Sequence, residues 1–165
     1  MNPKFDKPPR EVIAQIKHLT KALIDTSSII YAHKAGFLNV LQANLGLFTT
    51  ADVIAEAGTE AQNIELIHCD SESGSVDERL FYCALQNNLP LISEDKKILA
   101  KLKQTNLPYF NVLMMLNFLV YIEAIDQDQY SRYYALLKKI AWYSPKIWAH
   151  GKSVHRAIEE SMEAT

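Results

Sequence analysis

Four acidic residues in the first two thirds of the chain have the types and positions that metal chemistry needs. Asp25 ends an apolar run, Glu56 lies late in a helical pattern, and Asp77 and Asp95 stand where helical patterns begin. Carboxylates that share one cleft raise each other's pKa unless a cation neutralises them. All-oxygen ligands favour Mg²⁺ or Mn²⁺ rather than zinc. If the fold brings these side chains together, we expect them to hold a divalent metal ion.

Each acid also has a purely structural explanation. Asp25, Asp77 and Asp95 stand at helix starts, where the helix dipole favours a negative charge. Glu56 precedes Gly58 in a last helical turn, where the dipole disfavours it, so an exposed surface carboxylate is the alternative there. The histidines have no metal-binding spacing with one another and are expected to be surface or packing residues: His33, His68, His150 and His155.

The elements that must position these acids alternate between short apolar strands and helices. Ligands of open parallel sheets bind beyond the carboxyl ends of the strands, and several of the acids stand at such strand-to-helix junctions. We predict an α/β fold, a three-layer α/β/α sandwich with a central parallel sheet of four to five strands and extra C-terminal helices. The expected strands are 22–24, 47–49, 64–68, 91–92 and 108–110, and the expected helices are 10–19, 26–35, 37–43, 50–57, 76–87, 95–102 and 113–121.

Cap residues predict where several of these helices begin. The hydroxyl residues 26–28 are natural N-caps for the helix after Asp25. Thr49 with Asp52, and Ser75 with Glu78, have the spacing of a capping box.

The length and composition predict one compact unit. A chain of 165 residues with 48% hydrophobic content can fill a single core. We expect an N-terminal arm and helix over 1–20, the α/β domain over 21–123, and a helical extension over 124–165 packed on the same domain.

The chain also shows features of a cytoplasmic protein. Cys69 and Cys83 are expected to be buried free thiols in a reducing compartment. The N-terminal arm lacks an apolar run of the signal-peptide type. The apolar stretch 112–122 is too short to span a membrane and predicts a core helix.

The residues around the four acids resemble the motifs of the PIN-domain family. The run 23–30, with an acid between a strand and small hydroxyl residues, resembles the first motif, and 53–56 resembles the second. Asp77 and the segment 88–95 resemble the third and fourth in type and separation. The resemblance covers 22–116 and has departures: Ser93 replaces a common threonine, Glu94 adds an acid, and Glu78 competes with Asp77 as the third acid.

The resemblance implies a metal-dependent nuclease, with RNA as the expected substrate. Asp25, Asp77 and Asp95 would bind Mg²⁺ or Mn²⁺ directly or through water, and Glu56 would bind the metal or orient the attacking water. Metal ions at such a site activate a water and stabilise the leaving oxygen of a phosphodiester. Ser27 and Ser93 would support the acids or contact phosphate; whether one or two metals bind is left open.

Substrate binding needs local positive charge, because the formal net charge of −2 provides no overall cationic field. Lys96 and Lys97 directly follow Asp95 and could contact phosphates, although a solvated helix face explains them as well. The C-terminal part mixes cations with aromatic residues, which either stack on single-stranded bases or pack between helices. These residues are Lys138, Lys139, Trp142, Tyr143, Lys146 and Trp148.

Other functions stay open. A non-catalytic PIN-like module would bind RNA or protein without cutting, but the acid set is complete, which favours an enzyme. A phospho-acceptor or phosphatase domain could use Asp25 or Asp70 as nucleophile, but no second acid follows Asp25 at the expected spacing. The aromatic C-terminal helices could form a homodimer surface. The family resemblance further implies a toxin held by an inhibitory partner as a less favoured reading, because this chain is long for one.

Overall fold

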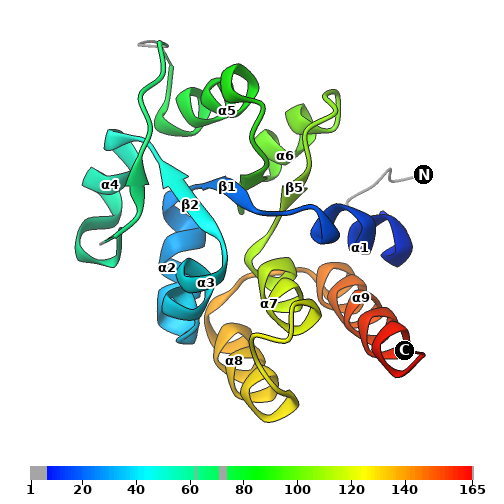
Figure 1. Cartoon of the computed structure of the whole chain (residues 1–165). Helices are drawn as coiled ribbons and strands as arrows, with labels where there is room; N and C mark the ends of the chain where they lie inside the picture. The colour runs from blue at the N-terminus through cyan, green and yellow to red at the C-terminus, as the bar shows by residue number, and fades with distance from the viewer. Residues whose placement is uncertain (1–6, 62, 71–73, 165) are drawn as a thin grey trace.

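The centre of the protein is a five-stranded sheet in which all strands run parallel. We describe a computed structural model, in which residues 7–61, 63–70 and 74–164 are placed. The strand order is β3-β2-β1-β4-β5, and Figure 1 labels β1, β2 and β5 of this sheet. The strands are β1 (Lys21–Ile24), β2 (Gly46–Thr49), β3 (Glu65–Leu66), β4 (Leu91–Ile92) and β5 (Tyr109–Phe110). The predicted α/β class with a parallel sheet is therefore confirmed.

Helices cover both faces of this sheet and extend beyond it. Helices α5 and α6 pack together on one side, and α2, α3 and α7 lie on the other (Figure 1). The C-terminal helix α8 packs on α2 and α7, and α9 packs on α1 and α7. The helices are α1 (Pro9–Lys17), α2 (Thr26–Ala35), α3 (Leu38–Asn44), α4 (Ala51–Ala57), α5 (Val76–Asn87), α6 (Lys96–Leu102), α7 (Val112–Tyr121), α8 (Gln127–Ile140) and α9 (Pro145–Glu163).

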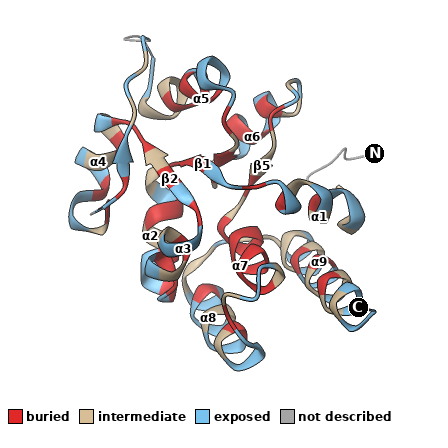
Figure 2. Ribbon diagram, in the orientation of Figure 1, coloured by how far each residue is buried: buried red, intermediate tan, exposed pale blue. Residues whose placement is uncertain are grey.

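The core lies between the central strands and the helices. Residues 22–24 of β1 and 91–92 of β4 are fully buried, as expected for parallel strands that are covered on both faces. All residues 112–120 of α7 are buried, which confirms the predicted core helix (Figure 2). Within the described residues, no helix is both long enough and apolar enough to cross a membrane.

The order of the strands creates a crevice between β1 and β4. From β1 the chain steps outward to β2 and β3, and it then returns past β1 to form β4 and β5. Adjacent strands whose following helices leave toward opposite faces open a gap at their carboxyl ends, where open α/β sheets bind ligands. Asp25 follows β1, and residues 93–95 follow β4. The topology therefore brings these two segments together.

Two of the predicted cap assignments are wrong. Asp25 itself caps α2, because its side chain accepts a hydrogen bond from the Ser28 N–H. Thr49 caps no helix, since its hydroxyl donates to the carbonyl oxygen of Ile24 in the neighbouring strand. Ser75 does cap α5 by accepting from the Glu78 N–H, as predicted. Local spacing failed in both cases for a tertiary reason: the Thr49 hydroxyl is used by a bond to β1, and β1 ends so that Asp25 stands at the cap position of α2.

The expectation of free thiols is also wrong. Cys69 and Cys83 form a disulfide. The bond joins the segment after β3 to the middle of α5, the helix whose first turn carries Asp77. A disulfide removes the argument for a reducing compartment. The cytoplasmic location stays a prediction.

Helix α9 packs closely on α7 at Gly151. A Cβ atom at this position would collide with Leu113, whose Cγ would lie 2.9 Å away. Both residues are buried, and the Asn117 amide donates a hydrogen bond to the Gly151 carbonyl oxygen at 3.0 Å. The contact leaves no room for a larger residue.

We predict that Gly151→Ala lowers the free energy of unfolding by about 1–3 kcal/mol, because overpacking a filled core has this cost. We expect this loss of stability even though alanine has a higher helix propensity than glycine. Urea unfolding of the variant and of wild type measures it, with exposed Ser153→Ala in the same helix as the control. A Gly151→Ala protein as stable as wild type would contradict the close contact.

Candidate functional site

Asp25 is the most buried of the four predicted acids. Its side chain is 3% exposed and accepts three hydrogen bonds, from the Ser28 N–H at 2.8 Å, the Ser93 hydroxyl at 2.6 Å and the Glu94 N–H at 3.1 Å. Burial raises the pKa of this carboxyl, and the hydrogen bonds oppose the rise because they favour the charged form. Asp25 is thus held rigidly at the β1–β4 crevice.

Ser93 links Asp25 to Asp95. While its hydroxyl donates to Asp25, it accepts a hydrogen bond from the Asp95 N–H at 3.1 Å. Asp95 then caps α6, with Oδ1 accepting from the Lys97 N–H at 2.8 Å and the Ile98 N–H at 3.3 Å. Oδ2 of Asp95 takes no part in this cap. The predicted phosphate contact of Ser93 remains untested, but in this structure its hydroxyl orients two of the acids.

Asp77 lies within electrostatic range of the other three acids. Its pKa is raised to about 6, first by partial burial, then by the negative charge of Asp25, by hydrogen bonding with Asp95 and the charge of Asp95, and by the charge of Glu56. These residues come from four different segments of the chain. Their mutual repulsion is what a divalent cation would relieve.

Glu56 is positioned by Thr26, the residue after Asp25. The Thr26 hydroxyl donates a hydrogen bond to Glu56 Oε2 at 2.9 Å, joining the start of α2 to the last turn of α4. Sequence reasoning treated Thr26 only as a helix cap. Its position next to Asp25 was the signal that could have assigned it to the site.

The arrangement brings the acids near one another without forming a closed cage. Among residues 7–61, 63–70 and 74–164, no three His, Cys, Asp or Glu side chains are placed so that they could jointly hold a metal ion. Mg²⁺ usually keeps several of its waters and is bound through one or two carboxylates, so a closed protein cage is not required. None of the four acids is in an ion pair with a cation in the described part of the chain. The positive groups that these acids contact are therefore backbone N–H groups rather than cationic side chains.

The other predicted site residues lie around this cluster. Ser27 is exposed on the first turn of α2, and Lys97 is exposed on the first turn of α6. Glu78 lies beside Asp77, and its backbone N–H donates to the Ser75 hydroxyl that caps α5. Lys96 lies at the edge of a cavity on the other side of the β4–α6 turn.

Glu94 is the residue that sequence reasoning undervalued. Its Oε1 accepts from the Val112 N–H at 2.8 Å and weakly from the Ser28 hydroxyl at 3.4 Å. Burial, partly opposed by these bonds, raises its pKa to about 8, and Asp25 adds to the rise. Oε2 has no hydrogen-bond partner within the described residues; the Tyr143 hydroxyl approaches the carboxyl but lacks the geometry of a bond. The signal in the sequence was an additional acid in the short turn between a strand and a helix, next to Asp95.

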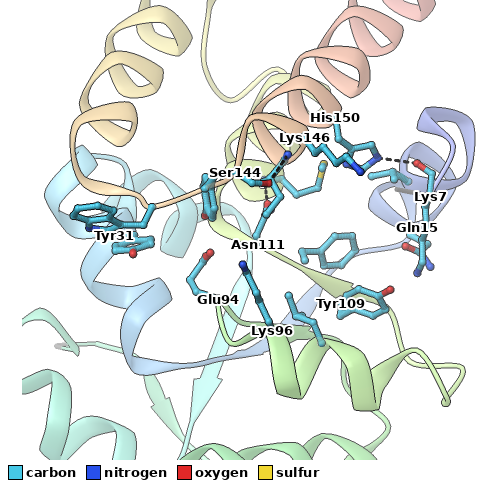
Figure 3. A pocket seen from close by; sticks show the side chains of 17 residues that line it. Lys7, Gln15, Tyr31, Glu94, Lys96, Tyr109, Asn111, Ser144, Lys146 and His150 are labelled. Carbon is cyan, nitrogen blue, oxygen red and sulfur yellow. Dashed lines mark hydrogen bonds between the residues drawn. The ribbon is translucent and has the colours of Figure 1, made fainter. Parts of the chain in front are cut away.

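The cavity beside Glu94 is separate from the acidic cluster. It has a volume of about 520 Å³ and lies between the β4–α6 turn, α1 and the start of α9 (Figure 3). None of the four acids lines it. The site therefore has two parts that share one turn: an acidic cluster on one side and a cavity on the other.

No protein-family model matches the chain, and no curated protein matches it significantly. The parallel five-stranded α/β fold is the part of the predicted resemblance that the structure establishes.

The raised pKa of Asp77 predicts a pH dependence of stability without metal. Between its usual value of 3.8 and about 6, the folded protein binds more protons than the unfolded chain, so the free energy of unfolding falls as the pH rises. Asp77→Asn should flatten this decline and leave the variant more stable than wild type at pH 7 in EDTA. Chemical unfolding at several pH values measures the difference between the two proteins.

Asp128→Asn, which changes an exposed acid on α8, is the control and should reproduce the wild-type profile. Glu94 contributes equally to wild type and to both variants, so it cancels in the comparison. If the free energy of unfolding changed with pH in the same way for wild type and Asp77→Asn, the pKa of Asp77 would not be raised by the other acids.

Proposed function

We propose that this protein is a metal-dependent nuclease of the PIN type that hydrolyses phosphodiester bonds in RNA. The observation that carries the proposal is the hydrogen bonding around the acids: the Ser93 hydroxyl joins Asp25 to Asp95, and the Thr26 hydroxyl, next to Asp25, holds Glu56. The charges of these three acids also contribute to the raised pKa of Asp77. A structural role for each acid on its own does not account for their convergence.

The residues present fit Mg²⁺ or Mn²⁺ by charge and by ligand type. Asp77 and Asp95 would bind the ion, and Asp25 and Glu56 would bind it directly or through water, because all three other acids act on the pKa of Asp77. A bound divalent ion supplies an activated water and stabilises charge on the phosphodiester. The protein holds its carboxylates in place through the Thr26 and Ser93 hydroxyls, so that little reorganisation is needed.

The location of the cluster supports a ligand-binding role. Asp25 and Asp95 follow the two strands between which the winding of the sheet reverses. At this crevice the backbone of an open α/β sheet leaves space that side chains from several segments can line. A phosphate bound there would approach the acids from the edge of the sheet.

A second candidate is a PIN-like module that binds RNA or protein without cutting. The observation in its favour is that no three of the described metal-ligating side chains are placed to hold an ion together. The complete set of four acids, three of which act on the pKa of Asp77, favours the nuclease, because a binding module gains nothing from the repulsion at Asp77. A homodimer and an inhibitory protein partner stay predictions.

We predict that purified protein cleaves a mixed pool of single-stranded and structured RNA when Mg²⁺ or Mn²⁺ is added, and not in EDTA. Asp77→Asn and Asp95→Asn should each lower the rate by about 100-fold or more, since losing a metal ligand costs at least as much as losing its supporting residue. Electrophoresis of the products measures the rate. Asp128→Asn is the matched control and should cut like wild type.

Equal cleavage by wild type and both site variants would reveal a contaminating nuclease and contradict the proposal. RNA binding without cleavage at any metal concentration would favour the non-catalytic module.

We further predict that Ser93→Ala lowers the cleavage rate by about 10–100-fold, because the hydroxyl orients both Asp25 and Asp95. The apparent Mn²⁺ affinity, taken from the metal dependence of the rate, should weaken in the same variant. Ser153→Ala, on the distant helix α9, serves as the control. Unchanged metal dependence in Ser93→Ala would mean that the hydroxyl does not position the acids.

A further inference from the structure

The cavity beside Glu94 has the size and lining of a ligand site. Its volume of about 520 Å³ falls within the range of roughly 300–1,000 Å³ that small-molecule sites occupy. Apolar side chains such as Val12, Leu99 and Ile147 form part of its wall, and Asn111 and Ser144 add polar groups. Such a mixture binds a flat apolar group that carries a few polar atoms.

The charge of the cavity is opposite to that of the acidic cluster. Three lysines, Lys7, Lys96 and Lys146, line it together with His150, against the single acid Glu94. Figure 3 shows Lys96 and Glu94 reaching from the β4–α6 turn toward the start of α9. In a chain with a formal net charge of −2, this local excess of cations suits an anionic ligand.

Aromatic rings surround one side of the cavity. Tyr31 and Tyr143 meet edge to face at 6.4 Å, and Tyr143 packs in turn against Trp148 at 5.1 Å. Trp142, which also lines the cavity, is 93% exposed and belongs to the turn between α8 and α9. The packed rings hold this turn in place, and the exposed indole is left with a face on which a base can stack.

The cavity and the acidic cluster share their wall at residues 93–95. Ser93 and Asp95 face the cluster, and Glu94 between them faces the cavity while its N–H donates to Asp25. Glu94 Oε1 is occupied by Val112 and Ser28, but Oε2 has no partner among the described residues. A nucleic-acid strand that crosses this turn could contact the acidic cluster and the cavity at once.

We propose that the cavity binds one nucleobase of a single-stranded RNA, next to the phosphodiester that the acidic cluster holds. The base enters between Trp142 and the wall formed by Glu94 and Asn111, and the lysines at the rim contact the adjoining phosphates. The part of the proposal that concerns the neighbouring phosphodiester rests on the nuclease function. The base-binding part does not.

The test measures binding of fluorescein-labelled hexaribonucleotides, one for each of the four bases, by fluorescence anisotropy in EDTA. Under these conditions the nuclease is inactive, so binding is measured without cleavage. Wild type should bind at least one hexamer saturably. Trp142→Ala and Lys146→Ala should each weaken binding by about 10-fold, as expected for the loss of a stacking aromatic or of a phosphate contact.

Matched controls separate the cavity from general surface effects. Leu136→Ala removes an exposed apolar side chain from α8, and Lys21→Ala removes an exposed lysine from the amino end of β1, opposite the carboxyl ends that carry the site. Both should bind RNA like wild type. Because Trp142 is almost fully exposed, its removal should leave the urea midpoint unchanged, which checks the fold of that variant.

A cleavage assay in Mn²⁺ then connects the two parts of the site. Wild type should show a base preference at a fixed position relative to the cut, and Trp142→Ala should lose that preference and raise KM more than it changes kcat. Hexamer binding without any cleavage would support the base site and contradict the nuclease. Cleavage with hexamer binding unaffected by Trp142→Ala and Lys146→Ala would overturn the base site alone. If no hexamer binds, the base site is also overturned, and a protein segment becomes the better occupant.

Discussion

The hydrogen bond between Ser93 and Asp25 is the interaction on which the rest of the site depends. It joins the carboxyl ends of β1 and β4, the two central strands between which the winding of the sheet reverses. The same hydroxyl accepts from the Asp95 N–H, so one side chain fixes two of the four acids. Both groups are buried, and a buried hydrogen bond to a carboxylate is stronger and more costly to lose than one in water.

This constraint has an electrostatic cost that hydrogen bonds offset only in part, since the pKa of Asp25 is still raised. Asp25 is kept out of water, and Asp77 faces Asp25, Asp95 and Glu56, which raises its pKa to about 6. A fold selected only for stability would separate such groups or pair them with cations. Arg79 lies close by on α5 but pairs with Asp52, outside the cluster. The repulsion between the acids thus remains at a place where a bound cation would relieve it.

The C-terminal helices convert this edge of the sheet into a two-part site. Helix α9 packs on α1 and α7, and the aromatic packing of Tyr143 and Trp148 holds the turn before it over Glu94. The result is an acidic cluster and a lysine-rimmed cavity on opposite sides of three consecutive residues. In the proposed function, this separation of charge would let the cavity attract RNA while the acidic cluster holds it through metal.

The sequence by itself determined the parallel α/β fold, because short apolar runs alternate with helical patterns, and this regular periodicity is a local property of the chain. It also marked Asp25, Glu56, Asp77 and Asp95 as candidate site residues, through their places after strands and at helix ends and through their resemblance to PIN motifs. Only the tertiary structure decided that Thr26 supports Glu56, that Thr49 bonds to β1, that Cys69 and Cys83 are joined, and that Glu94 faces a cavity. The physical reason is that these roles are contacts between distant segments, whose side-chain directions follow from how the sheet winds and how α9 packs.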